Sequence, residues 1–136
     1  CGEILAKYML ESVKDNELEF DLISYVPMTK KALKSRGYNQ SEFFAKYLSQ
    51  YLDIPVICNL VKTQDTKDQI GLSGDQRWDN MKKCFEIKGN EVIKNKNILL
   101  VDDVITTGAT AFNCAHILKV NGATNIFILT IAKSNV

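Results

Sequence analysis

The chain has 136 residues, of which 46% are hydrophobic, and its formal net charge at pH 7 is +1. A chain of this length forms one domain around a single core. The balance of 17 basic and 16 acidic residues gives no overall positive field, so the composition does not support nucleic-acid binding by this chain alone. No apolar run approaches the ~18 residues of a membrane span, and no secretion-signal pattern leads the sequence, so we expect a cytoplasmic protein with no membrane partner.

The first 20 residues predict an N-terminal helix. Within Glu3–Leu10, apolar residues recur at helical spacing between charged ones, as in a helix that packs one face on a core. Cys1 invites comparison with glutamine amidotransferases that use an N-terminal cysteine as nucleophile. The helical pattern and the short chain, which leaves no room for a glutaminase domain, argue against that role.

A strand and a basic segment come next. Asp21–Pro27 is predicted as a strand, because it is rich in apolar and aromatic residues. Four cations then follow within seven positions: Lys30, Lys31, Lys34 and Arg36. If this strand lies beside a second strand that ends in an anion site, these cations face that site.

Gln40–Leu52 predicts a second helix. An apolar and aromatic stripe recurs within it at helical spacing, and we interpret the stripe as core rather than as a base-stacking platform. It consists of Phe43, Phe44, Tyr47, Leu48 and Tyr51. Asp53–Pro55 ends the helix, and Val56–Val61 predicts a short strand.

Residues 62–93 predict a flexible loop and a hairpin. Lys62–Met81 is polar with few periodic signals, and a polar segment of that length in a compact domain is usually functional or disordered. Within Phe85–Ile93, alternating runs flank Gly89-Asn90, a pattern typical of a hairpin.

The stretch Ile98–Thr110 is the most informative part of the sequence. An apolar run suited to a buried parallel strand ends in two adjacent carboxylates, Asp102 and Asp103. A loop rich in threonine and glycine follows, in which several backbone N–H groups can converge on one point. The stretch predicts a phosphate site; an ordinary strand, turn and helix with an Asp-rich turn is the alternative.

The predicted helix Ala109–Asn121 begins at this loop. Its N-terminal dipole would stabilise an anion by about 0.3–1 kcal/mol. Asp102 and Asp103 would repel a phosphate unless sugar hydroxyls or a divalent cation such as Mg²⁺ lay between them, so the site predicts a sugar phosphate. Gly122 would end the helix, and Asn125–Ile131 is the last predicted strand.

Strands alternate with helices along the whole chain. This order indicates an α/β fold with a mainly parallel sheet and helices on both faces. The loop is neither a Walker loop, which would need Gly-Lys-Ser/Thr, nor the G-x-G-x-x-G dinucleotide pattern.

Ile98–Thr110 closely resembles the phosphoribosyl diphosphate (PRPP) signature of type I phosphoribosyltransferases, a hydrophobic strand, two acidic residues and a T-x-G-x-T-like loop. The resemblance implies a single phosphoribosyltransferase-like domain over residues 1–136, with residues 98–121 as the PRPP-binding strand, loop and helix. It implies that Asp102 and Asp103 contact the ribose hydroxyls, close to the Mg²⁺ ion that accompanies PRPP. It also implies a loop that binds the ribose 5-phosphate, formed by Thr106, Thr107, Gly108, Ala109 and Thr110.

A second resemblance widens the match to about residues 21–133. The V-P…K-K…R-G-Y-N-Q pattern up to Gln40 is similar to the ComF family, competence-associated and gluconate-cluster proteins described as amidophosphoribosyltransferases. It continues through a Q-x-x-L…R-x-x-N…F stretch formed by Gln69, Leu72, Arg77, Asn80 and Phe85.

The ComF resemblance assigns roles to the basic residues. It implies that Lys30 and Lys31 lie in or beside the loop that meets the pyrophosphate, and that Arg36 contacts an anion. In type I phosphoribosyltransferases a flexible loop at this place in the sequence closes over the substrate, and the resemblance implies that Arg77 would reach the pyrophosphate from it. A solvated run of charges is the alternative interpretation of the lysines.

The cysteines and the histidine do not form a zinc-binding pattern in the sequence. The cysteines at 1, 58, 84 and 114 form no C-x-x-C pair and His116 is the single histidine, so we expect reduced, mostly buried thiols and no structural zinc in this chain. His116 is interpreted as a packing or surface residue of its helix. Because ComF-like proteins usually carry a four-cysteine zinc module before the transferase domain, we expect a chain truncated at its N-terminus.

The resemblance implies transfer of the 5-phosphoribosyl group from PRPP to an unknown nitrogen acceptor, with release of pyrophosphate. An oxocarbenium-like state requires the protein to hold the phosphate, neutralise the leaving group and exclude water. Asp102 or Asp103 is the candidate general base. The alternative is a non-catalytic PRPP- or nucleotide-binding protein of competence and DNA uptake. The candidate macromolecular partner is a second copy of this chain or a component of the competence machinery.

Overall fold

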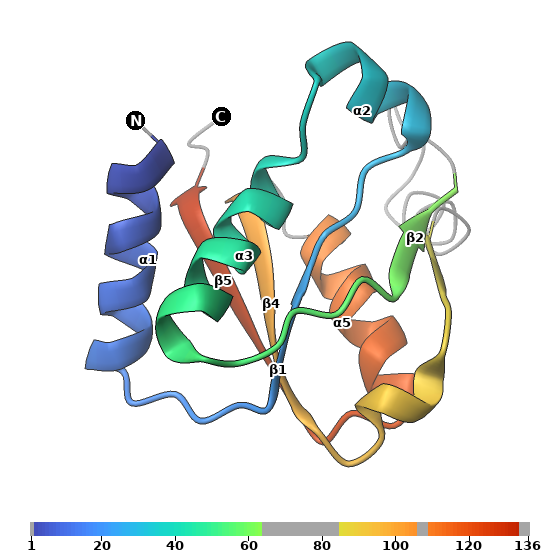
Figure 1. Ribbon diagram of the computed structural model, residues 1–136. Coiled ribbons are helices and arrows are strands. Elements are labelled where there is room, and N and C mark those ends of the chain that lie inside the picture. The colour runs from blue at the N-terminus through green and yellow to red at the C-terminus, as the bar shows by residue number, and fades with distance from the viewer. Residues whose placement is uncertain (1, 64–84, 106–108, 134–136) are drawn as a thin grey trace.

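The computed structural model describes residues 2–63, 85–105 and 109–133, and its centre is a parallel sheet (Figure 1). The central strand β4 (Asn97–Ile105) lies between β1 (Leu22–Tyr25) and β5 (Asn125–Lys133), and both pairings are parallel. The chain after Pro55 lines the outer edge of β1, since Ile23 exchanges backbone hydrogen bonds of 2.9 and 2.8 Å with Pro55 and Ile57.

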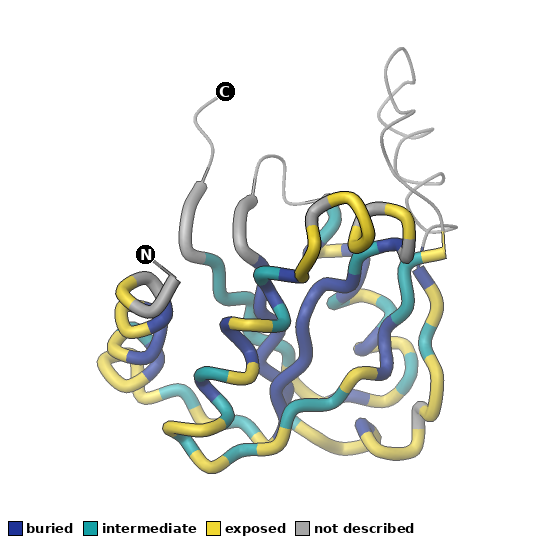
Figure 2. The backbone as a smooth tube through the Cα atoms, turned by 45° about the horizontal axis from the view of Figure 1, so that its top comes forward, coloured by how far each residue is buried: buried dark blue, intermediate teal, exposed yellow. Residues whose placement is uncertain are grey.

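Helices cover both faces of this sheet, as the alternation of elements predicted. Helices α1 (Gly2–Asp15) and α3 (Gln40–Leu52) lie on one face, and α5 (Ala109–Val120) lies on the other (Figure 1). Because successive strand residues point to opposite faces, the sheet feeds two separate cores. Figure 2 shows the buried stretches running through the middle of the molecule, with exposed residues on the outside.

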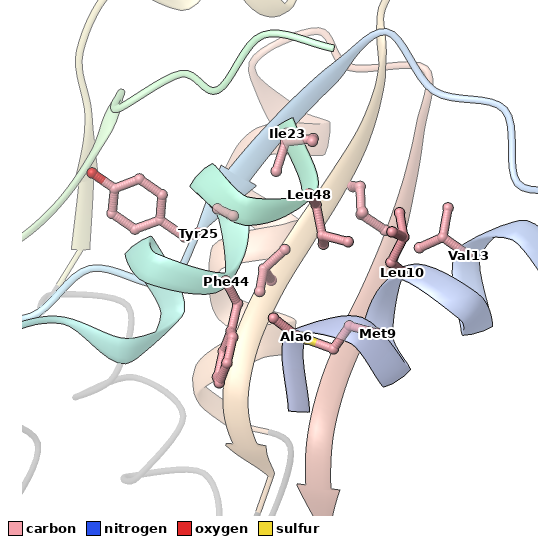
Figure 3. Packing of buried hydrophobic residues seen from close by; sticks show 11 residues of the cluster. Ala6, Met9, Leu10, Val13, Ile23, Tyr25, Phe44 and Leu48 are labelled. Carbon is pink, nitrogen blue, oxygen red and sulfur yellow. The ribbon is translucent and has the colours of Figure 1, made fainter. Parts of the chain in front are cut away.

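The core under α1 and α3 is aliphatic and aromatic (Figure 3). Ile23 from β1 and Leu99 from β4 contribute to it, together with Phe44 and Leu48 from α3. The opposite core, under α5, takes the alternate strand residues Leu22, Ile98 and Leu100, together with Cys114 and Leu118.

The stripe predicted on α3 is buried only in part. Phe44 and Leu48 are fully buried, whereas Phe43 is 39% exposed and Tyr51 57% exposed. The interpretation of the whole stripe as core is therefore wrong for these two residues, because the helix turns them away from the sheet. Tyr51 instead stacks on Tyr47, with ring centroids 4.6 Å apart.

Asn39 fixes the start of α3 against the sheet. Its side-chain oxygen accepts hydrogen bonds from the backbone N–H groups of Ser41 and Glu42, and its amide donates to the carbonyl of Val26 directly after β1. A side-chain cap of this kind pairs helix N–H groups that otherwise have no partner. Between β1 and this cap the chain forms the short helix α2 (Lys30–Arg36).

A two-stranded antiparallel ribbon, β2 (Leu60–Lys62) with β3 (Phe85–Ile87), packs beside α5. The prediction of a strand over Val56–Val61 is wrong in its bounds, because Val56 makes a single parallel bridge to Ile23 and the strand begins at Leu60. The chain thus leaves the edge of β1 before it joins the ribbon.

The hairpin predicted over Phe85–Ile93 is also wrong. After β3, Gly89 adopts a left-handed conformation with φ 65° and the chain enters a 3-10 helix, η2 (Asn90–Ile93), which buries Ile93 completely. The partner of β3 is β2, which lies more than twenty residues earlier in the sequence.

The ends of the other elements differ little from the predictions. The N-terminal helix stops at Asp15, the first strand at Tyr25 and α5 at Val120, while the last strand continues to Lys133. Gly122, with φ 116°, follows α5 as predicted. No helix within the described ranges has the length and hydropathy of a membrane span.

Candidate functional site

The candidate site lies at the carboxyl edge of the parallel sheet. Because β1, β4 and β5 run in the same direction, their carboxyl ends meet at one edge, shown at the top of Figure 1. The chain leaves β1 toward α2 and leaves β4 toward α5, so the segments that follow two adjacent strands share this edge. Ligands of open α/β sheets bind in this place.

Asp102 is the best-defined residue of the site. It lies on β4, opposite Thr130 of β5, and it is 7% exposed. Since Asp102 follows Leu100 by two residues, both side chains lie on the α5 face of the sheet. Asp103 continues β4, but its side chain lies outside the described part of the structure.

The predicted phosphate loop is described only at its C-terminal end. Thr106, Thr107 and Gly108 lie outside the described residues, as does the side chain of Ala109. Helix α5 starts at Ala109, directly after the loop, and Thr110 in its first turn is half-buried. The strand, the position of the loop and the helix therefore follow the predicted order.

The cations predicted near the site lie on α2. Lys30 is the first residue of this helix and Arg36 the last, but neither side chain belongs to the described part. Lys31 and Lys34 are exposed. Because β1 pairs with β4 in parallel, the strand before these cations lies beside the strand before the predicted loop; that the cations face a phosphate stays a prediction. Arg77 lies outside the described residues.

Cys114 of α5 lies close to charged residues of two other elements, β4 and β2. Its thiol is fully buried, and burial together with the nearby charge of Asp102 raises its pKa, while the charge of Lys62 acts in the opposite direction. Charges on β4 and β2 thus both act on one side chain of α5. The cysteine prediction holds for Cys114, but Cys58 is exposed.

Tyr25, the last residue of β1, contacts Cys58. Its hydroxyl donates a 3.0 Å hydrogen bond to the Cys58 sulfur, and burial, then Cys58, raises the pKa of this tyrosine. His116 is exposed on α5, which agrees with its interpretation as a surface residue rather than a packing residue.

Several polar residues near the sheet were not singled out from the sequence. Ser24, Asn59 and Asn113 are buried, and their side-chain polar atoms have no hydrogen-bond partner within the described part of the chain. Asn113 lies on the second turn of α5. A polar residue on an otherwise apolar face of the predicted helix could have pointed to it.

The arrangement suits a magnesium ion that arrives with its substrate. No group of three His, Cys, Asp or Glu side chains among the described residues could hold a metal ion by itself. Mg²⁺ commonly keeps several waters and takes only one or two carboxylates together with substrate phosphates. The Asp102 carboxylate at the sheet edge fits that pattern, and Asp103 is its neighbour in sequence.

A separate cleft lies between α2 and α3. It has a volume of about 560 Å³ and is lined by side chains that include Leu33, Tyr38, Phe43 and Lys46. Lys46 forms a 2.8 Å ion pair with Glu42 on its own helix. Of the predicted site residues whose side chains the structure describes, Lys31, Asp102 and Thr110, none lines this cleft.

Curated relatives match the sequence over most of its length, although no protein-family model matches it. Competence protein F of Haemophilus influenzae is 34% identical over 140 residues, which cover 96% of this chain and 60% of the relative. DNA utilization protein YhgH of Shigella flexneri is 30% identical and is covered to 50%. The chain thus spans about half to three fifths of the length of these relatives.

Solved structures match the fold. Glutamine PRPP amidotransferase from B. subtilis, complexed with ADP and GMP, superposes with a TM-score of 0.64 at 21% identity, over 93% of this chain and 25% of that chain. Purine phosphoribosyltransferase from Pyrococcus horikoshii superposes with a TM-score of 0.59 at 20% identity, over 98% of this chain and 75% of that one. By sequence the chain is a homologue of the competence F and YhgH proteins, and its fold matches that of type I phosphoribosyltransferases.

Proposed function

We propose that this chain binds PRPP at the carboxyl edge of its sheet and transfers the 5-phosphoribosyl group to a nitrogen acceptor. The observation that carries the proposal is the position of Asp102. The buried Asp102 carboxylate lies in the carboxyl-terminal half of the central strand, which runs on to Ile105 and then into the predicted phosphate loop and α5, while the adjacent parallel strand leads into the lysines of α2.

Each element has a role in the proposed binding mode. The loop between β4 and α5 holds the 5-phosphate, supported by the positive end of the α5 dipole. Asp102 and Asp103 accept hydrogen bonds from the ribose hydroxyls. Lys30 and Lys31, at the start of α2, neutralise the pyrophosphate, with Arg36 and Arg77 as further anion contacts.

In the proposed reaction the bond between the anomeric carbon and the pyrophosphate oxygen breaks, and a bond from the acceptor nitrogen to that carbon forms. The pyrophosphate leaves with the electron pair of the broken bond, and the nitrogen loses a proton to Asp102, Asp103 or solvent. Bound Mg²⁺ would supply charge neutralisation on the pyrophosphate. The protein contributes orientation and fixed charges that stabilise the transition state.

Proteins that share one fold can have different functions, and we therefore propose a second candidate function. The relatives' printed names, competence protein and DNA utilization protein, favour a chain that binds PRPP or a nucleotide without turnover and acts in competence. Both candidates share the donor site and differ in whether pyrophosphate is released.

Pyrophosphate release separates the two candidates. The purified chain with Mg²⁺ and PRPP is incubated with ammonia, with primary amines or with nucleobases, and pyrophosphate is quantified by a coupled assay. Acceptor-dependent release supports the transferase. Saturable PRPP binding without release for every acceptor supports the non-catalytic candidate, and the Asp102→Asn variant serves as the control for background hydrolysis.

A further inference from the structure

The ribbon of β2 and β3 presents one side chain that does not match its neighbours. Leu60 pairs with Ile87 and Lys62 pairs with Phe85, and directly paired residues of an antiparallel ribbon share a face. Leu60, Phe85 and Ile87 all pack in the core under α5. Lys62 is therefore the single cation on the face of this ribbon that packs on α5.

The ammonium group of Lys62 is held by its surroundings. Its Nζ lies 5.6 Å from the centroid of the Phe85 ring, a distance typical of a cation–π contact. The residue is only half-exposed, so its stem covers apolar surface while its charge stays near the rim of the core.

Lys62 and Asp102 approach α5 from two different elements. Leu60 and Phe85 of the ribbon pack in the same core as Leu100 of β4 and Cys114 of α5, and Asp102 shares the face of Leu100. The effects of both charges on the pKa of Cys114 agree with this placement. The carboxyl end of β2 also lies at the same end of the molecule as the carboxyl ends of β1 and β4 (Figure 1).

We propose that Lys62 is a further binding residue of the site, whose ammonium group contacts an oxyanion of PRPP from the ribbon side. The inference rests on the proposed function, because it requires PRPP at the edge of the sheet. The oxyanion belongs either to the pyrophosphate or to the 5-phosphate, which have the same contact chemistry. Charge-assisted contacts to phosphate oxygens are among the stronger hydrogen bonds of proteins.

The test compares Lys62→Met with Lys62→Arg by calorimetric titration of PRPP in the presence of Mg²⁺. We expect Lys62→Met to raise the Kd for PRPP about tenfold or more, because it removes the charge and keeps a flexible stem over Phe85. Lys62→Arg keeps a cation and should stay within about threefold of the unmodified chain. Lys88→Met removes an exposed lysine directly after β3 and should leave the Kd unchanged.

Titrations with pyrophosphate alone and with ribose 5-phosphate alone identify the contacted group. Weaker binding of pyrophosphate only assigns Lys62 to the leaving group, and weaker binding of ribose 5-phosphate only assigns it to the 5-phosphate. Lys62→Met that binds PRPP as tightly as the unmodified chain overturns the inference and leaves the proposed function standing. An unmodified chain that does not bind PRPP contradicts both.

Discussion

Asp102 is almost completely buried in the carboxyl-terminal half of the central strand β4. We predict that Asp102→Asn weakens the binding of PRPP with Mg²⁺ about tenfold or more, because the amide keeps the size of the side chain but loses its charge. Calorimetric titration measures the affinity, and circular dichroism checks that the fold is kept.

Asp53→Asn is the matched control for this charge change. Asp53 is exposed at the C-cap of α3 and has a left-handed conformation that asparagine also tolerates. We expect this variant to bind PRPP like the unmodified chain. Equal PRPP affinity in Asp102→Asn and Asp53→Asn would contradict the role assigned to Asp102.

Asp103 is the second carboxylate predicted to contact the ribose hydroxyls and the Mg²⁺ ion. Asp103→Asn should weaken PRPP binding in the presence of Mg²⁺ and should have a smaller effect in its absence, since the loss then concerns the ribose hydroxyls alone. The readout is the ratio of the two dissociation constants. A ratio equal to that of the unmodified chain would speak against a metal contact of Asp103.

The two described cysteines should differ in reactivity. Cys58 is exposed, whereas burial and the charge of Asp102 raise the pKa of Cys114 and keep it as a protonated thiol. In a variant with serine at positions 1 and 84, we expect a thiol reagent at pH 8 to modify Cys58 quickly and Cys114 only after denaturation. Rapid modification of both thiols in the native chain would show that the core under α5 is open.

At the scale of elements, α3 carries a matched pair of aromatic residues. Phe44 is fully buried between α3 and the sheet, and Phe43 beside it is 39% exposed. We predict that Phe44→Ala lowers the free energy of unfolding by about 3–5 kcal/mol. Phe43→Ala should cost clearly less, and comparable losses in urea unfolding would contradict the packing of α3.

The sequence predicts α3 with its observed bounds because several signals agree there. Phe44 and Leu48 recur at helical spacing and Asp53–Pro55 ends the helix, and the structure adds the Asn39 cap at its start. The ribbon could not be predicted in the same way. The run from Val56 to Val61 is apolar except for Asn59 and does not show where the strand begins, and the pairing of Lys62 with Phe85 depends on a partner far away in the chain.

At the scale of the whole molecule, parallel order brings distant segments to one edge. The strand, acidic pair and loop of residues 98–110 could be predicted because they are contiguous in the sequence. Lys62 could not, since its place beside α5 follows from the packing of the ribbon on Cys114 and Leu118. The alternation of strands and helices was sufficient for the fold class, which the structure confirms.

The central claim is that this edge of the sheet binds PRPP. The most direct measurement is calorimetric titration of the chain with PRPP, with and without Mg²⁺. The account predicts saturable binding to one site that strengthens when Mg²⁺ is present. A folded chain that shows no saturable binding of PRPP under either condition would contradict it.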